Sequence, residues 1–305
     1  MFFLKHILIL LITLILIPDM NSFRSQLKFL LVQGRAIPQI GEHIQYFPSN
    51  WKEEFPLIRP LGLSGIEWIY DKKSEEYNPI LSKSGRNEII NYSKKFNVEL
   101  ENVVLDWFLD NPLLLENQVL FEKNSSTLIK LIKCCSLCGF QRIIFPLLEK
   151  NSIHEDYLFD KFVLFFKNEI LELLDSFNIE IHFETSLSPQ REMELLKLLD
   201  HSKLKICYDM GNSTSLRFEA NFTLTTISKY LGSVHVKDRR VNGPSVPLGN
   251  GNVNFNEVFQ TLVHINFNGP ISFQVYRNKN SNNIEILKQG VSFINNVIDD
   301  ILEKK

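Results

Sequence analysis

The sequence predicts an α/β protein that folds into one eight-stranded (β/α)8, or TIM, barrel preceded by a hydrophobic N-terminal extension. From about residue 28 onward, eight short apolar runs alternate with longer amphipathic runs, which is typical of a parallel sheet with helical connections. Eight such units suit closure into a barrel. The chain of 305 residues, 44% of them hydrophobic, is large enough for a single core of this kind. An open doubly wound sheet competes with the barrel, but no G-x-G-x-x-G follows the first strand.

The predicted strands are short runs rich in β-branched and aromatic residues, and they fall at residues 28–33, 64–70, 102–108, 142–147, 179–184, 204–209, 233–238 and 271–276. The segments between them carry apolar residues at three- and four-residue spacing, which predicts amphipathic helices. The clearest of these helices fall at residues 87–96, 125–138, 160–177, 190–200, 255–265 and 283–304.

We expect residues 1–26 to be an extension outside the barrel and residues 27–305 to form a single catalytic domain. Residues 7–17 are an unbroken apolar run, which is shorter than the roughly 20 residues that a membrane span needs. No small-residue cleavage site follows it. Three interpretations stay open: a signal or anchor, an extension outside the fold, or translation from Met20. Apart from this run, we expect no membrane contact and a cytoplasmic location.

The charge and cysteine content exclude two other classes of protein. The formal net charge is −2, with 33 basic and 35 acidic residues well mixed, so no basic stripe indicates a nucleic-acid partner. The chain has a single C-x-x-C and no second half for a zinc site. We therefore interpret its four cysteines as buried, reduced thiols: Cys134, Cys135, Cys138 and Cys207.

Polar side chains gather at the predicted strand ends, where barrel enzymes place their catalytic groups. They are Gln33, Arg35, Glu67, Asp106, Glu149, Glu184, Asp209, His235, Lys237, Asp238, Gln274 and Arg277. Glu184, Asp209 and His235 come from three successive strands, and two carboxylates with an imidazole form a plausible site for one divalent cation. This donor set suits Mn²⁺, Mg²⁺, Co²⁺ or Zn²⁺ without choosing among them. Lys237 lies two residues beyond His235 and so on the same face.

Six stretches carry a family resemblance: "VQGR", "GLSGIEWIYD", "FETSLSP", "CYDMGNS", "VHVKDRR" and "VPLGNGNVNF". Together they resemble the signature stretches of the sugar phosphate isomerase/epimerase group within the xylose isomerase-like barrels, over about residues 28–277. The resemblance implies a divalent metal held by Glu184, Asp209 and His235. It also implies a strand-eight ligand, usually a glutamate, and this chain has Gln274 there.

The resemblance further implies an isomerase or epimerase of a sugar or sugar phosphate that works through a cis-enediolate. Glu184 would be the base, and Lys237 would place positive charge near the substrate oxygens. Because Gln274 lacks useful basicity near neutral pH, we expect one-base isomerisation to be favoured. Epimerisation would need a substitute base, such as Lys237 or Glu67, on the other face.

Further residues are expected to contact the substrate or to support the site. Gly249 and Gly251 lie just before a predicted helix, and their backbone N–H groups, with Arg239 or Arg240, are candidates to bind a phosphate. Asp238 would orient a neighbouring group. The other expected substrate contacts are Arg35, Glu67 and Arg277.

Two rival functions remain at this point. The abasic-site endonuclease branch of the same barrels needs several further histidines, and the predicted third and fourth strands contain none. A metal- or sugar-binding barrel without activity is suggested by Gln274. A homo-oligomer is possible under any of these functions.

Overall fold

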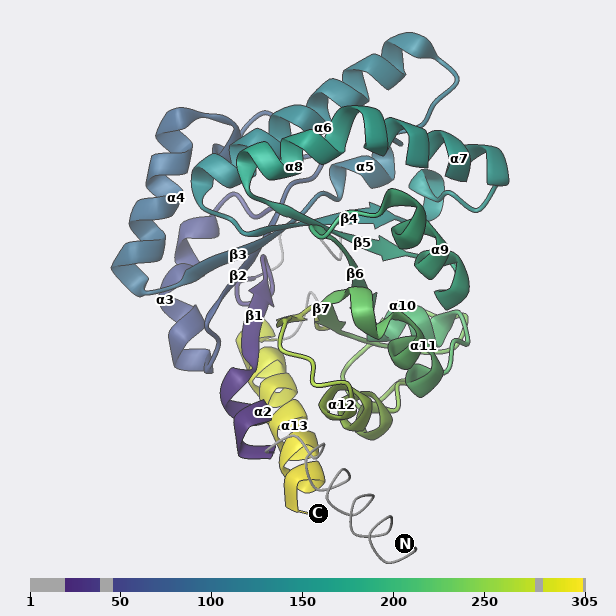
Figure 1. The fold of residues 1–305 in the computed structure, drawn as a ribbon. Coiled ribbons are helices and arrows are strands. Elements are labelled where there is room, and N and C mark those ends of the chain that lie inside the picture. Colours follow the sequence, from purple (N-terminus) through teal and green to yellow (C-terminus); the bar gives the residue numbers. More distant parts are fainter. Residues whose placement is uncertain (1–19, 39–45, 278–281, 304–305) are drawn as a thin grey trace, which may run out of the picture.

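A computed structural model describes residues 20–38, 46–277 and 282–303. Eight parallel strands close into a barrel in the order β1-β10-β7-β6-β5-β4-β3-β2, which confirms the predicted fold class (Figure 1). The strands are β1 (Lys28–Val32), β2 (Gly65–Ile69), β3 (Glu99–Val104), β4 (Arg142–Leu147), β5 (Glu180–Thr185), β6 (Leu204–Asp209), β7 (Leu231–Val236) and β10 (Pro270–Phe273).

The predicted helices form around the barrel (Figure 1), and three begin at least four residues earlier than the apolar pattern suggests. Ser82 accepts a hydrogen bond from the backbone N–H of Gly85, and Asn117 accepts one from Leu120, so each caps a helix that starts with a polar turn. The helices expected from periodicity are α4 (Lys83–Phe96), α6 (Gln118–Cys138), α7 (Asp156–Phe165), α8 (Leu171–Phe177), α9 (Pro189–Leu199), α12 (Phe255–His264) and α13 (Asn283–Glu303).

Several shorter helices escaped the periodicity argument because each has too few turns to show a pattern. They are α2 (Met20–Gln26), α3 (Phe55–Ile58), α5 (Trp107–Asp110), α10 (Met210–Ser215) and α11 (Ala220–Ile227). A π-helical turn at Phe166–Ile170 joins α7 to α8. Single 3₁₀ turns lie at Trp51–Glu53, Arg59–Leu61, Pro79–Leu81, Glu149–Asn151 and Ser228–Tyr230.

Several strand boundaries differ from the sequence prediction; the end of β3, for example, is Val104 and not residue 108, and the end of β10 is Phe273 and not residue 276. Strand β3 begins at Glu99, before the apolar run, because Glu99 and Glu101 pair with Lys28 of β1 at 2.9 Å each. These ion pairs stabilise charged residues at the start of the strand. Strand β7 ends at Val236, and the two residues Asp238–Arg239 (β8) then pair antiparallel with Ser245–Val246 (β9).

The predicted extension is described only from residue 20 onward, and its apolar run lies outside the described residues. Helix α2 lies beside α13 (Figure 1), with Phe23 buried in the core and Arg24 paired with Asp299. Residues 20–26 therefore pack against the barrel domain, and the boundary expected at residue 26 falls within packed structure. Along the described parts of the chain, no helix combines the length and the apolar character that crossing a bilayer requires.

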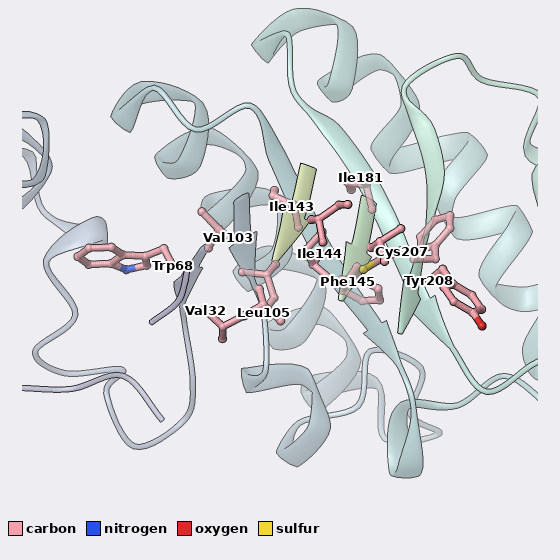
Figure 2. Close-up of a cluster of buried hydrophobic side chains, with 14 of the residues drawn as sticks. Val32, Trp68, Val103, Leu105, Ile143, Ile144, Phe145, Ile181, Cys207 and Tyr208 are labelled. Carbon is pink, nitrogen blue, oxygen red and sulfur yellow. The ribbon is translucent and has the colours of Figure 1, made fainter. Parts of the chain in front are cut away.

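The apolar core lies mainly between the strands and the surrounding helices, as the cluster in Figure 2 illustrates. Phe145 of β4 and Phe183 of β5 both pack against Phe162 and Phe166 of the helical layer, with ring centroids 5.3–6.3 Å apart. Because side chains alternate along a strand, the neighbours of these outward rings point into the barrel. Glu184 is one such neighbour, so the packing of Phe183 fixes its direction.

Candidate metal centre and substrate cavity

The structure brings together the three residues expected to bind a metal. Glu184 lies near the end of β5, Asp209 ends β6, and His235 lies near the end of β7, where it pairs in register with Asp209. One donor atom from each residue lies within 4.8 Å of the other two, and all three side chains are buried. His235 Nδ1 lies 3.8 Å from Glu184 Oε2 and 3.9 Å from Asp209 Oδ2.

The donor atoms of this group fit a divalent cation. Both ring nitrogens of His235 are buried without a hydrogen-bond partner among the described residues, although Nε2 lies 2.9 Å from Glu67 Oε1. An unsatisfied buried polar atom is costly, and this cost applies most clearly to Nδ1. The same nitrogen faces two carboxylate oxygens. A cation in contact with all three atoms would satisfy the nitrogen and offset the charge of the carboxylates. Two oxygens and one nitrogen suit several divalent ions.

Ionisation at this centre is strongly perturbed. Burial, with the nearby Asp209 and Asp106 carboxylates, raises the pKa of Glu184 to about 7, although His235 and Lys237 oppose the shift. Burial alone would lower the pKa of His235, but the neighbouring Cys207 and Glu67 raise it well above its ordinary value. A metal ion at this centre would therefore compete with protons for Glu184 and His235.

Asn212 fixes the two carboxylates, and the sequence analysis did not single it out. Its backbone N–H donates to Asp209 Oδ1 at 2.7 Å, and its side-chain Nδ2 donates to Glu184 Oε1 at 2.8 Å. Its Oδ1 accepts from Arg239 Nη1 at 2.8 Å. The remaining carboxylate oxygens, Asp209 Oδ2 and Glu184 Oε2, are the ones that face His235. The spacing of Asp209 and Asn212, typical of a helix N-cap and its third residue, is a sequence signal for this contact.

Lys237 and Gln274 lie beside the metal ligands. Lys237 Nζ lies 3.4 Å from Asp209 Oδ2 and donates to Gln274 Oε1 at 3.1 Å. Lys237 therefore shares the inward face with His235, as the two-residue spacing predicts. Gln274 follows β10 and is nearly buried.

A cavity of about 570 Å³ opens above these residues. Four of the predicted site residues line it: Glu184, Lys237, Arg239 and Gln274. Asp106 and Glu149, noted at strand ends, also line it. Further polar lining residues come from loops and short helices, which carry no periodic signal, and they were not predicted: Tyr46, Asp71, Lys72, Lys73, Asp110, Ser186, Asn212 and Ser215.

Glu67, expected from its strand to contact the substrate, lies outside the cavity lining in this structure. Its side chain is completely buried. Its Oε1 lies 2.9 Å from His235 Nε2. Its Oε2 accepts hydrogen bonds from Asn102 Nδ2 at 2.9 Å and Ser272 Oγ at 2.7 Å. Glu67 therefore lies behind His235, on the side away from Glu184 and Asp209.

The glycine amides expected to bind phosphate are already occupied. Gly249 and Gly251 both donate their N–H groups to Asp238 Oδ2, at 2.9 and 2.8 Å, and Val253 donates to Oδ1 at 3.2 Å. The contact is close, since a Cβ on Gly251 would lie 2.1 Å from Asp238 Oδ1. In this structure these two N–H groups are therefore not available to a phosphate. Asp238 holds this loop and not a group of the metal centre, and Arg240 is exposed outside the cavity lining.

Arg35 and Arg277 are buried behind the cavity and not in its lining. Arg277 donates to the backbone oxygen of Gly34, and its guanidinium lies over the Tyr46 ring at 5.0 Å from the centroid. Burial, with the nearby Arg277, lowers the pKa of Arg35 to about 9. The two arginines support the segment after β1, so direct substrate contact is not their role in this structure.

All four cysteines are buried free thiols, as expected. Burial raises the pKa of Cys207, the one nearest His235, to about 11, so its sulfur stays a neutral thiol at physiological pH. Among the described residues, the group formed by Glu184, Asp209 and His235 is the one set of carboxylate, imidazole and thiol groups close enough to hold a metal.

Comparisons with known proteins agree with this geometry. A family model described as a xylose isomerase-like TIM barrel matches residues 55–297. An uncharacterized protein of Methanocaldococcus jannaschii is 29% identical over 143 residues, which cover 42% of this chain and 48%, about half, of that protein.

Solved structures resemble the whole barrel at low sequence identity, which shows a shared fold. D-psicose 3-epimerase from Clostridium cellulolyticum H10, solved with D-tagatose, is 14% identical with a TM-score of 0.71, over 90% of this chain and 99% of that one. An L-ribulose 3-epimerase is 12% identical with a TM-score of 0.72, over 91% and 96%. The IOLI protein, solved with a bound zinc atom, is 12% identical with a TM-score of 0.70, over 90% and 99%.

Proposed function

The chain belongs to the xylose isomerase-like TIM barrel family, and from that premise we propose that it is a divalent-metal-dependent isomerase or epimerase of a sugar or sugar phosphate. One observation carries the proposal. The donor atoms of Glu184, Asp209 and His235 lie within 4.8 Å of one another, and Glu184 also lines a cavity of about 570 Å³, a volume suited to a small molecule. The sugar epimerases among the structural neighbours support the same class.

Glu184, Asp209 and His235 would hold one divalent cation, and Gln274 Oε1 would offer a further oxygen. When bound, the cation would act as a Lewis acid that makes the proton on the carbon between two sugar oxygens easier to remove. Asn212 and Lys237 would keep the carboxylates in place, because both contact them directly.

Glu184 would move the proton. Its carboxylate lines the cavity, where it can reach a bound sugar. Asn212 holds one of its oxygens, which fixes the direction of the other. Removal of the proton from the carbon next to the ketose carbonyl would give a cis-enediolate, and return of that proton to the adjacent carbon would complete an isomerisation.

The choice between isomerisation and epimerisation depends on a base on the opposite face of the sugar. Gln274 has no useful basicity. Glu67, the substitute considered from sequence, lies behind His235 and outside the cavity lining. Lys237 is the remaining one of the two substitutes considered, and it is held against Asp209 and Gln274. This arrangement favours one-base isomerisation.

A phosphorylated substrate would meet side chains and not the glycine loop. Lys72, Lys73 and Arg239 line the cavity in addition to Lys237. Their charges would suit a phosphate in the cavity. This location replaces the one expected at Gly249 and Gly251.

The proposal is tested by stripping the purified full-length protein of metal and reloading it with Mn²⁺, Mg²⁺, Co²⁺ or Zn²⁺. Each form is then incubated with a panel of ketoses and ketose phosphates, and the products are separated by chromatography. We expect conversion of at least one sugar by a metal-loaded form and none by the stripped protein or by Asp209→Asn. Metal-loaded protein that binds a sugar without converting it would favour the non-catalytic alternative.

A further inference from the structure

Glu67 lies at the centre of the barrel, where three strands hold it against His235. Its carboxylate comes from β2, and its Oε2 accepts hydrogen bonds from Asn102 of β3 at 2.9 Å and Ser272 of β10 at 2.7 Å. Its Oε1 lies 2.9 Å from His235 Nε2 of β7. Glu67, Asn102, Ser272 and His235 are all completely buried. Oε2 of Glu67 therefore accepts from Asn102 and Ser272, and Oε1 faces the His235 imidazole.

This geometry determines which nitrogen of His235 is available to a metal. An ionised carboxylate only accepts hydrogen bonds. When the imidazole is neutral, its remaining proton is therefore stabilised on Nε2, opposite Glu67. The lone pair is then on Nδ1, the nitrogen that faces Glu184 and Asp209 at 3.8 and 3.9 Å.

The hydrogen bonds that Glu67 Oε2 accepts from Asn102 and Ser272 favour the ionised carboxylate in this buried position. A buried carboxylate is tolerated only where charge and hydrogen bonds compensate it, and here both are present.

We propose that Glu67 is a positioning residue that selects the Nε2-protonated form of His235 and so presents Nδ1 to the metal. Carboxylates behind metal-binding histidines orient the ring and increase its basicity. The proposal rests on the metal centre of the proposed function and is independent of which sugar reacts.

The substitution Glu67→Gln tests the proposal because a glutamine has only one acceptor oxygen. It cannot accept from Asn102 and Ser272 on one side and from His235 Nε2 on the other. If its oxygen accepts from Asn102 and Ser272, its NH₂ group faces His235 Nε2, which must then be an acceptor. The imidazole proton moves to Nδ1 and blocks the metal. We expect Mn²⁺ affinity, measured by calorimetry on the full-length protein, to fall about 10–100-fold.

The matched control is Glu54→Gln. Glu54 is also completely buried and also accepts two hydrogen bonds, from the N–H groups of Gly34 and Ala36. It is not part of the metal group. We expect Glu54→Gln to lower the melting temperature while leaving Mn²⁺ affinity unchanged, so a general loss of stability is distinguished from loss of the ligand.

A spectroscopic measurement reads the tautomer directly. In protein labelled with ¹⁵N at histidine and loaded with Zn²⁺, we expect His235 to show a protonated Nε2 and a metal-bound Nδ1. In metal-free Glu67→Gln at a pH where the imidazole is neutral, we expect the proton on Nδ1. If wild type binds metal and Glu67→Gln has the same affinity and the same tautomer, the proposal for Glu67 is overturned. The metal centre itself would still stand.

Two other outcomes are also decisive. Wild-type protein that binds no divalent metal would contradict the metal centre, and the proposed function would fail with it. If Glu67→Gln does not fold, Ser272→Ala removes one donor to Glu67 and keeps the carboxylate. A several-fold loss of Mn²⁺ affinity in Ser272→Ala supports the positioning role, and unchanged affinity contradicts it.

Discussion

Lys237 Nζ donates a hydrogen bond to Gln274 Oε1 at 3.1 Å, beside the carboxylates of the metal centre. The same ammonium lies 3.4 Å from Asp209 Oδ2. A neutral amide thus stands where the family resemblance places a carboxylate, and it is paired with a cation. The pair is the feature of this chain that departs most from a two-carboxylate site.

Gln274→Glu should restore a second base and an additional anionic ligand. A glutamate there would pair with Lys237 and bring negative charge to the metal site, so we expect tighter Mn²⁺ binding by calorimetry. We also expect an epimerised ketose to appear among the products, because each face of the sugar would then have a base. An unchanged product mixture with unchanged affinity would show that Gln274 does not determine the outcome.

Asp209→Asn should reduce the metal content of the protein. The substitution removes a negative charge from the metal group, while the Asn212 N–H can still donate to the remaining amide oxygen. Elemental analysis of purified protein checks this, with the exposed Asp175→Asn as a control for handling. Wild type and Asp209→Asn are compared as purified and again after chelator treatment and reloading with metal. Equal metal content in the two proteins under both conditions would argue against the assignment of Asp209.

Glu192 should make stability depend on pH. Burial raises its pKa to about 7 from 4.5, although a hydrogen bond from Thr185 opposes the shift. Because the folded state binds this proton more tightly than the unfolded state, the contribution is fully present below pH 4.5. It is lost as the pH rises through about 7.

Glu192→Gln has no such proton to lose. The unfolding free energy of wild type relative to Glu192→Gln should therefore fall by about 3 kcal/mol between pH 4.5 and 8. Denaturant unfolding of both proteins at several pH values measures this difference. A difference that does not change with pH would mean that Glu192 has an ordinary pKa.

Asp238→Ala should release the loop from Gly249 to Val253. It removes an almost completely buried carboxylate that accepts three backbone hydrogen bonds, and hydrogen bonds to charged groups contribute about 1.5–3 kcal/mol each. We expect a loss of about 3 kcal/mol in unfolding free energy, since the freed amides regain water. We also expect faster hydrogen exchange at Gly249 and Gly251. The exposed Asp300→Ala is the control, and protection that persists in Asp238→Ala would exclude this role.

The fold and the grouping of Glu184, Asp209 and His235 could be predicted from sequence because both depend on local patterns. Apolar runs mark the strands, and Glu184, Asp209 and His235 follow from the rule that barrel sites lie at strand ends. Glu67 was misassigned because the sequence does not show depth within the barrel. It is the third of five residues in β2 and pairs with Asn102, so it lies below the strand end, whereas Asp209 ends β6.

The glycine loop and Asn212 show a second limit. Sequence identifies the backbone N–H groups of Gly249 and Gly251 as donors, but it does not reveal that Asp238, at least eleven residues earlier, accepts from them. Asn212 connects the carboxylates of two different strands. Contacts of this kind depend on how strands align around the barrel, which no local pattern encodes.

The most direct test of the central claim is solvent deuterium incorporation into a bound ketose. Metal-loaded protein is incubated in heavy water with each ketose or ketose phosphate that binds, and deuterium is located by NMR. We predict deuterium on the carbon next to the carbonyl or on the carbon that becomes it, none after metal removal, and a rate about 10²–10⁴ lower in Glu184→Gln. Sugars that bind to the metal-loaded protein and gain no deuterium would contradict the account.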